Sequence, residues 1–132
     1  MSHHKEIISS PRIPQVKAPY SVGVKTGNLV FTAGQIGLHP DTMQLVTGGI
    51  EAETRQVLEN IKNVLEAAGS SLDNVVKTTV YMRDLSEFAQ MNSLYAQYFT
   101  ANFPARTTIQ AGALPLGAAV EIEAIGVISN EG

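Results

Sequence analysis

An arginine in the last third of the chain has the chemical character of an anion-binding residue. Arg106 follows Pro104-Ala105 and precedes the uncharged run 107–109, so it is the one cation of this segment. A guanidinium group presents a planar fork of donors that matches the two oxygens of a carboxylate. An ordinary surface arginine or ion pair is the alternative that position alone favours.

Two carboxylates close to the end of the chain form a second candidate group. Glu121 and Glu123 alternate with apolar residues in the run 120–124, so both project from the same face of a strand, about 7 Å apart along it. A carboxylate held there can orient a water molecule. The alternatives are a solvated strand face, which is common in antiparallel sheets, and an ion pair with Arg106.

Three further residues have side chains or backbone groups suited to a pocket. Tyr20 follows Ala18-Pro19, where a phenol can donate a hydrogen bond from a loop or simply pack. Asn92 lies on the polar side of a predicted helix, where a solvent-facing amide is the simpler reading. Gly34 follows a strand and either lets a ligand approach the backbone closely or forms a plain turn.

Composition and missing motifs exclude several classes of function. The 132 residues carry a net charge of -3, with 9 Lys and Arg against 12 Asp and Glu, so no basic surplus exists for nucleic acid. The chain has no cysteine, and its three histidines, His3, His4 and His39, lack the H-x-E and H-E-x-x-H contexts of a hydrolytic zinc site. Nucleotide-binding loops and the G-x-S-x-G elbow are also absent. We therefore expect no metal and no cofactor.

The start of the chain and its apolar runs indicate a soluble protein. The first residues lack the apolar core of a secretory signal and the Arg-rich pattern of a transit peptide. No apolar run approaches the length of a membrane span. We expect a cytoplasmic protein with no membrane partner.

Residue periodicity predicts five or six strands and two helices, in the order ββ(β)αβαββ. Helical spacing extends from Ile50 to Ala68 and is followed by Gly69, a typical helix-ending residue, whereas a second helix follows the capping sequence 84–87. Its apolar stripe comprises Phe88, Met91, Leu94, Tyr95, Tyr98 and Phe99. Strands are predicted at 6–8, in a hairpin at 21–33 around Gly27-Asn28, and at 75–82, 105–110 and 120–128.

This order of elements predicts one α+β domain spanning residues 1–132. Two amphipathic helices and a mixed sheet of about six strands fit a two-layer fold with both helices on one face. We assign Thr78, Val80, Ile122 and Ala124 to the other face, which would then need self-association to cover it.

Over nearly its whole length the chain resembles the Rid (YjgF) family of 2-iminobutanoate/2-iminopropanoate deaminases. The Pro-Ala-Arg and Val-Glu-Ile-Glu-Ala segments, at their proper spacing, are the specific part of the match. The matching segments are 18–21 (APYS), 31–36 (FTAGQI), 53–62 (ETRQVLENIK), 65–69 (LEAAG), 76–80 (VKTTV), 103–107 (FPART) and 120–125 (VEIEAI).

The resemblance implies a chorismate-mutase-like subunit that forms a homotrimer with three sites in the clefts between subunits. Arg106 matches the arginine that binds the substrate carboxylate, and Glu121 matches the glutamate near the attacking water. Tyr20, Asn92 and the Gly34 backbone match pocket positions. Thr108 stands where many bacterial relatives carry a cysteine, which excludes a thiol mechanism and leaves Thr108 as a pocket residue.

The function implied is a cofactor-independent hydrolysis of enamine and imine intermediates. The substrates would be 2-aminoacrylate, 2-iminopropanoate and 2-iminobutanoate, and the products 2-keto acids and ammonia. The alternatives are a keto-acid-binding or regulatory protein, an endoribonuclease or translation inhibitor, and a chaperone-like interaction protein.

Overall fold

The computed structural model describes residues 4–128, so that His3, one of the three histidines considered above, lies outside the described part. In chain order, the elements follow the predicted ββ(β)αβαββ pattern, with all three early strands present and three short 3-10 turns added. They are β1 (Glu6–Ile8), β2 (Gly23–Thr26), β3 (Leu29–Thr32), α1 (Gly49–Ala67), η1 (Leu72–Asn74), β4 (Val75–Met82), η2 (Leu85–Glu87), α2 (Phe88–Tyr98), β5 (Ala105–Gln110), η3 (Pro115–Gly117) and β6 (Val120–Val127).

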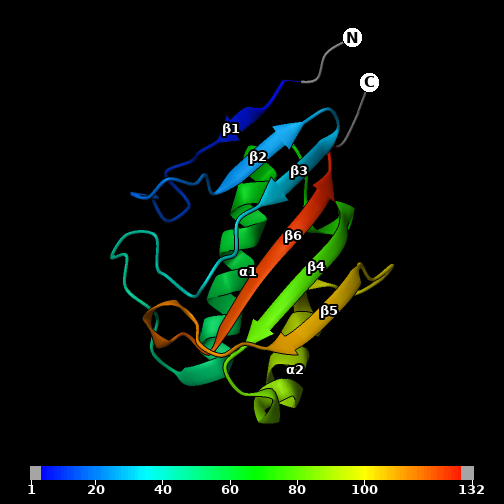
Figure 1. The fold of residues 1–132 in the computed structure, drawn as a ribbon. Helices are drawn as coiled ribbons and strands as arrows, with labels where there is room; N and C mark the ends of the chain where they lie inside the picture. The colour runs from blue at the N-terminus through cyan, green and yellow to red at the C-terminus, as the bar shows by residue number, and fades with distance from the viewer. Residues whose placement is uncertain (1–3, 129–132) are drawn as a thin grey trace.

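The six strands form one mixed sheet in the order β1-β2-β3-β6-β4-β5 (Figure 1). Only β4 and β5 are parallel, and α2 forms the crossover between them. In register, Thr78 of β4 lies beside Arg106 of β5, whereas Tyr81 of β4 lies beside Glu121 of β6. Arg106 and Glu121 therefore lie on the two strands that flank β4.

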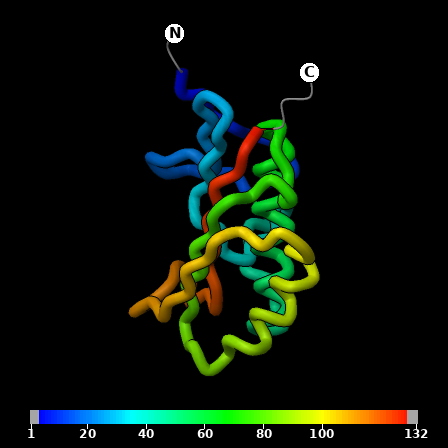
Figure 2. Tube along the Cα trace, turned by 90° about the vertical axis from the view of Figure 1, so that its right-hand side faces the viewer, coloured from blue at the N-terminus to red at the C-terminus, as the bar shows by residue number. Residues whose placement is uncertain are grey.

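Both helices cover the same face of the sheet, as predicted (Figure 2). The core lies between them and the strands, with the apolar stripe of α1 fully buried. Beyond α1, the Gly69 and Ser70 N–H groups donate to the carbonyls of Glu66 (3.1 Å) and Leu65 (2.8 Å), and Gly69 has a φ of 89°. This pair of bonds is a Schellman motif, which explains why a glycine ends the helix.

The start of α2 follows the predicted capping sequence in part. The Asp84 carboxylate accepts a hydrogen bond from the Ser86 N–H at 2.9 Å, and this contact lowers the pKa of Asp84. The cap opens the short turn η2, which runs directly into α2. An acidic side chain at this position satisfies a free N–H of the first turn.

The assignment of four strand residues to the uncovered face was wrong. Thr78, Val80, Ile122 and Ala124 are all at most 2% exposed and pack on the helix side. Alternation along a strand separates two sets of residues but does not say which set faces the core. The complementary set therefore faces away from the helices.

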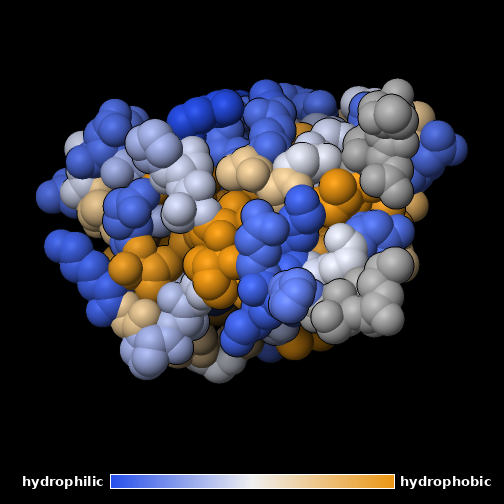
Figure 3. All heavy atoms as spheres, turned by 90° about the horizontal axis from the view of Figure 1, so that it is seen from above, coloured by the Kyte–Doolittle hydropathy of each residue, from blue (hydrophilic) through white to orange (hydrophobic). Residues whose placement is uncertain are grey.

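The uncovered face of the sheet is a mixture of apolar and charged side chains. Phe31 and Ile109 are exposed on it and lie beside Ile125 and Tyr81 in register. Seen from above, the end of the molecule that carries the termini shows separate apolar patches between hydrophilic ones (Figure 3). Across residues 4–128, no helix has the length and hydropathy needed to cross a bilayer.

Candidate functional site

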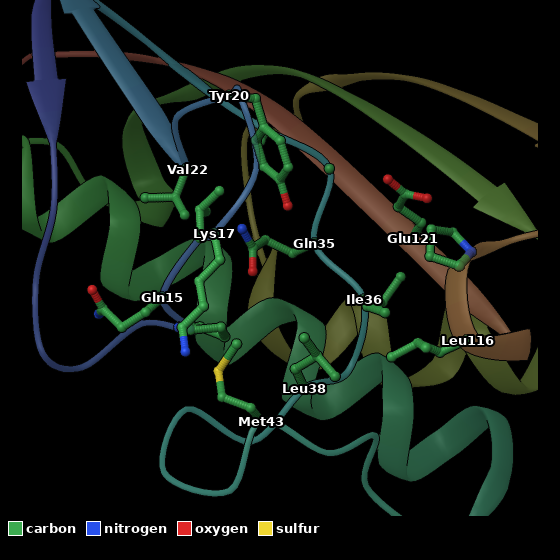
Figure 4. Close-up of a pocket in the computed structure, with 15 residues that line it drawn as sticks. Gln15, Lys17, Tyr20, Val22, Gln35, Ile36, Leu38, Met43, Leu116 and Glu121 are labelled. Atoms are coloured by element: carbon green, nitrogen blue, oxygen red, sulfur yellow. The ribbon is translucent and has the colours of Figure 1, made fainter.

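Glu121 lies in a cavity of about 580 Å³ on the uncovered side of the sheet. The loop that carries Tyr20 and the turn η3 project to this side, away from the helices (Figure 2). In Figure 4, Tyr20 and Lys17 lie on one side of the cavity, and Glu121 and Leu116 on the other. The remaining wall is largely apolar and comprises Pro14, Val16, Val22, Ala33, Ile36, Leu38, Met43 and Pro115, together with Gln15, Gly34 and Gln35.

The carboxylate of Glu121 is held in a partly dehydrated, negatively charged setting. Glu121 is half-buried, and burial raises its pKa; the nearby negative charge of Glu123 raises it further. The same two carboxylates also affect the neighbouring phenol: the pKa of Tyr81 is raised by burial first and then by Glu123 and Glu121. A carboxylate with a raised pKa is a stronger base when ionised.

Gly34 makes room for the Glu121 side chain. A methyl group built on Gly34 would run into the Glu121 carboxylate and would lie 2.9 Å from its Cδ and 3.1 Å from its Cγ. Two backbone hydrogen bonds between Gln35 and Ile122, of 2.8 and 3.1 Å, hold this segment against β6. The glycine is therefore required by its close approach to the Glu121 side chain, not by a left-handed turn.

The start of β6 is fixed by a buried carboxylate from α1. Glu53 is 5% exposed and its Oε1 accepts a hydrogen bond from the Ala119 N–H at 2.7 Å. A charge-assisted bond inside the core is short and directional. Because Ala119 is two residues before Glu121, this contact fixes the strand end from which Glu121 projects.

Arg106 lies on the opposite side of the sheet, under α2. Its Nη1 donates to Asn92 Oδ1 at 2.7 Å, and the guanidinium carbon lies 4.6 Å from the ring centre of Tyr95 and 5.5 Å from that of Phe88. Asn92, Tyr95, Ala96, Phe99, Phe103 and Pro104 line, with Arg106, an adjacent cavity of about 430 Å³.

The charge of Arg106 has no acidic counterpart in the described chain. Between residues 4 and 128, the ion pairs are Arg12 with Glu66 and Arg83 with Glu87, and neither involves Arg106. A half-buried guanidinium held by a neutral amide and by aromatic faces keeps donors and charge for an external anion.

The structure thus divides the predicted site residues into two groups. Tyr20, Gly34 and Glu121 share the first cavity, and Arg106 and Asn92 share the second. The hypothesis of an ion pair between Arg106 and Glu121 within one chain is wrong, because the two side chains leave the sheet on opposite faces.

Two of the smaller predictions have different outcomes. Asn92 was expected to be a solvent-facing amide. In the structure it is half-buried and accepts a hydrogen bond from Arg106. Thr108 is half-buried on the same side of β5 as Arg106, beside Val80 in register, but it lines neither cavity.

Sequence reasoning assigned Tyr95 and Phe88 to the apolar stripe of the second helix and missed their contact with Arg106. A tyrosine in place of an aliphatic residue within a buried stripe is the signal that was available, because a buried phenol requires a polar partner. The apolar wall formed by Ile36, Met43 and Leu116 has no comparable signature, since its members come together only in the folded chain.

The fold and the two cavities define a two-layer α+β domain with Arg106 beside a cavity on one side of the sheet and Glu121 in a cavity on the other. The chain belongs to the YjgF/Rid family: the family model described as Endoribonuclease L-PSP matches residues 11–128. Fold class and family are therefore as the sequence predicted.

Relatives and solved structures agree with this membership. A RutC family protein of Pyrococcus horikoshii is 50% identical over 121 residues, covering 92% of this chain and 96% of the relative. The 2-iminobutanoate/2-iminopropanoate deaminase of Homo sapiens is 43% identical over 123 residues, covering 93% and 90%. The crystal structure of Escherichia coli TdcF with bound serine has a TM-score of 0.89 at 39% identity, covering 94% and 99%.

Proposed function

We propose that this protein is a hydrolytic deaminase that converts 2-imino acids, formed from enamines such as 2-aminoacrylate, into 2-keto acids and ammonia. The substrates would include 2-iminopropanoate and 2-iminobutanoate. The observation that carries the proposal is the guanidinium of Arg106, which is half-buried without an acidic partner in residues 4–128 and is therefore suited to a substrate carboxylate.

The names of the relatives support the reaction class. The human relative is named for deamination of 2-iminobutanoate and 2-iminopropanoate, and the serine bound to Escherichia coli TdcF carries an α-carboxylate next to an amino-bearing carbon. The imino acids in the human relative's name and the serine bound to TdcF each carry a carboxylate beside a nitrogen-bearing carbon. These are the groups that an arginine and a water-activating carboxylate would recognise. The net charge of -3 gives less support to the ribonuclease activity in the family description.

We further propose that the working form is a homotrimer with its sites between subunits. Arg106 and Glu121 leave opposite faces of the sheet, so one chain does not bring them to the same substrate. We propose that a neighbouring copy covers the uncovered face and brings its own Arg106 to the Glu121 cavity. Burial of Phe31, Ile109 and Ile125 would contribute to the stability of such an assembly.

In the proposed mechanism, Arg106 holds the carboxylate and Glu121 activates a water molecule. The water oxygen bonds to the imine carbon, the C=N bond becomes a single bond, and one water proton passes to Glu121. That proton then passes from Glu121 to the nitrogen, which completes a tetrahedral intermediate with one hydroxyl and one amino group. Glu121 next takes the hydroxyl proton and delivers it to the amino nitrogen as the carbonyl forms, so that the C–N bond breaks with its electron pair on nitrogen and neutral ammonia leaves. Positioning and a general base each lower the barrier without any further group.

The first test is the rate of keto-acid release from freshly generated 2-iminobutanoate, measured against the spontaneous rate. Arg106→Ala should lose saturable activity while it keeps its fold and assembly. The matched control is Arg55→Ala, because Arg55 is exposed on α1 and lines neither cavity. Full activity in Arg106→Ala would contradict the role of the arginine.

A second test addresses the location of the site. Arg106→Ala and Glu121→Gln subunits, each inactive alone, are unfolded together and refolded as mixed trimers. If each site takes one residue from each of two subunits, about a quarter of the interfaces regain both groups, and about that share of activity returns. No recovery from well-folded mixed trimers would contradict a site between subunits.

The alternative that remains is a ligand-binding protein without turnover. A binder would hold a 2-keto acid through Arg106 and would not accelerate imine hydrolysis in the wild type. Binding without acceleration over the spontaneous rate would therefore favour that alternative over the deaminase.

A further inference from the structure

Beneath the Arg106 guanidinium lies a tyrosine that is anchored by the sheet itself. The ring of Tyr95 is 6% exposed, and its centre lies 4.6 Å from the guanidinium carbon. Its hydroxyl is hydrogen-bonded to Thr78 Oγ1 at 2.8 Å, and Thr78 is 1% exposed. The phenol is therefore held at both ends, by α2 through its backbone and by β4 through its oxygen.

Tyr95 contacts both Arg106 and the strand residue that lies beside Arg106. Thr78 is the register partner of Arg106 across the parallel pair β4 and β5. Thr78 therefore anchors the Tyr95 ring, and the guanidinium of Arg106 lies over that ring. Asn92, three residues before Tyr95 on α2, accepts a hydrogen bond from Arg106 Nη1 through its Oδ1 at 2.7 Å. The long arginine side chain is thus fixed at its backbone and at its guanidinium.

A purely structural role would not require this chemistry. Leucine or phenylalanine would fill the same space in an apolar helix stripe, whereas a buried tyrosine and threonine each need a polar partner. The flat ring supports the flat guanidinium and attracts its charge without neutralising it, which a carboxylate would do. Within residues 4–128 the guanidinium donates through Nη1 to Asn92, and its remaining donors are available to an anion.

We propose that Tyr95, anchored by Thr78, is a positioning residue that presents Arg106 to the carboxylate of the substrate. This inference rests on the proposed function, since it concerns the same arginine. Tyr95 acts through Arg106 and does not itself touch the reacting carbon. Its removal should therefore weaken carboxylate binding and leave the chemical step unchanged.

The experiment compares variants by KM and kcat for 2-iminobutanoate generated in situ, and by the Kd of 2-ketobutanoate measured by calorimetry. Tyr95→Leu removes the ring and should raise KM and Kd by about tenfold, with kcat within about twofold of the wild type. Tyr95→Phe keeps the ring and loses only the bond to Thr78, so it should raise KM and Kd by less than Tyr95→Leu does. The matched control is Tyr98→Leu, because Tyr98 lies on the same helix but bonds to Glu59 at 2.8 Å, away from Arg106.

A second set of variants removes the anchor with little change in volume. Tyr95→Phe, Thr78→Val and their combination form a cycle. Each single variant should raise Kd by less than Tyr95→Leu does, and the double variant should raise it no further, because the two hydroxyls act as a pair. A wild-type Kd in all three folded variants would overturn the anchoring role of Thr78. This set keeps the inference testable should Tyr95→Leu fail to fold.

The outcomes separate the two proposals. A folded Tyr95→Leu protein with wild-type KM and Kd would overturn the positioning role while loss of activity in Arg106→Ala leaves the proposed function standing. Full activity in Arg106→Ala would overturn both. An equal rise of KM in Tyr98→Leu would show a general effect of helix damage and would also overturn the positioning role.

Discussion

Replacement of Gly34 by alanine tests whether the position of the Glu121 carboxylate matters for the reaction. The new methyl group would overlap the carboxylate and lie 2.9 Å from Cδ, whereas carbon atoms in ordinary contact lie about 3.5–4.0 Å apart. The Glu121 carboxylate must therefore move by about 1 Å. A displacement of that size at a reacting group costs about 10²-fold in rate.

The same substitution should leave the fold nearly unchanged. Gly34 is absent from the glycines with positive φ, so alanine adds no backbone strain there. Since Glu121 is half-buried and its side chain has other rotamers open to it, we expect the free energy of unfolding to change by less than about 1 kcal/mol. The rate effect should therefore greatly exceed the stability effect.

The assay is kcat/KM for 2-iminobutanoate, with thermal unfolding measured on the same preparations. Gly112→Ala is the matched control, because a methyl group there meets nothing within 4 Å and Gly112 also lies in a loop without positive φ. We expect about a hundredfold loss in Gly34→Ala and none in Gly112→Ala. Wild-type kcat/KM in Gly34→Ala would refute the reasoning, because a displaced Glu121 would then serve as well as a fixed one.

Two further predictions concern the pH profile and the core. Burial and then the negative charge of Glu123 raise the pKa of Glu121, and a general base must be ionised to act. Glu123→Gln should therefore lower this pKa and move the acidic limb of the kcat/KM profile to lower pH. An unchanged limb would exclude Glu121 as the titrating base. The Thr54 hydroxyl is fully buried without a hydrogen-bond partner in residues 4–128. Thr54→Val should therefore stabilise the fold by about 1 kcal/mol and raise Tm by about 4 °C. A lower Tm in calorimetry would show that the hydroxyl has a partner.

Local features of this chain were predictable because local chemistry determines them. The stripe from Ile50 to Ala68 and the following Gly69 predicted α1 to within a residue or two at each end, since both depend on neighbours in sequence. The alternation around Glu121 and Glu123 correctly placed both carboxylates on one face of a strand.

Long-range features were not predictable from one sequence. Alternation did not reveal that Thr78 and Ile122 face the helices, because the direction of the core depends on where the helices pack. The separation of Arg106 from Glu121 depends on the register of β4 with its two neighbours. The contact of Asn92 with Arg106 depends on the crossover that places α2 over β5. The family resemblance supplied the residue names but not this geometry within one chain.

The position of β6 in the sheet affects how the protein folds during its synthesis on the ribosome. The last strand of the described chain lies between β3 and β4, so both keep an unpaired edge until residues 120–127 have left the exit tunnel. Translation takes on the order of 10 s for a chain of this length, during which the nascent sheet is in two separate halves. Chaperones that shield open edges would therefore act late in synthesis, and messages truncated before codon 120 would yield aggregation-prone fragments without the Glu121 carboxylate.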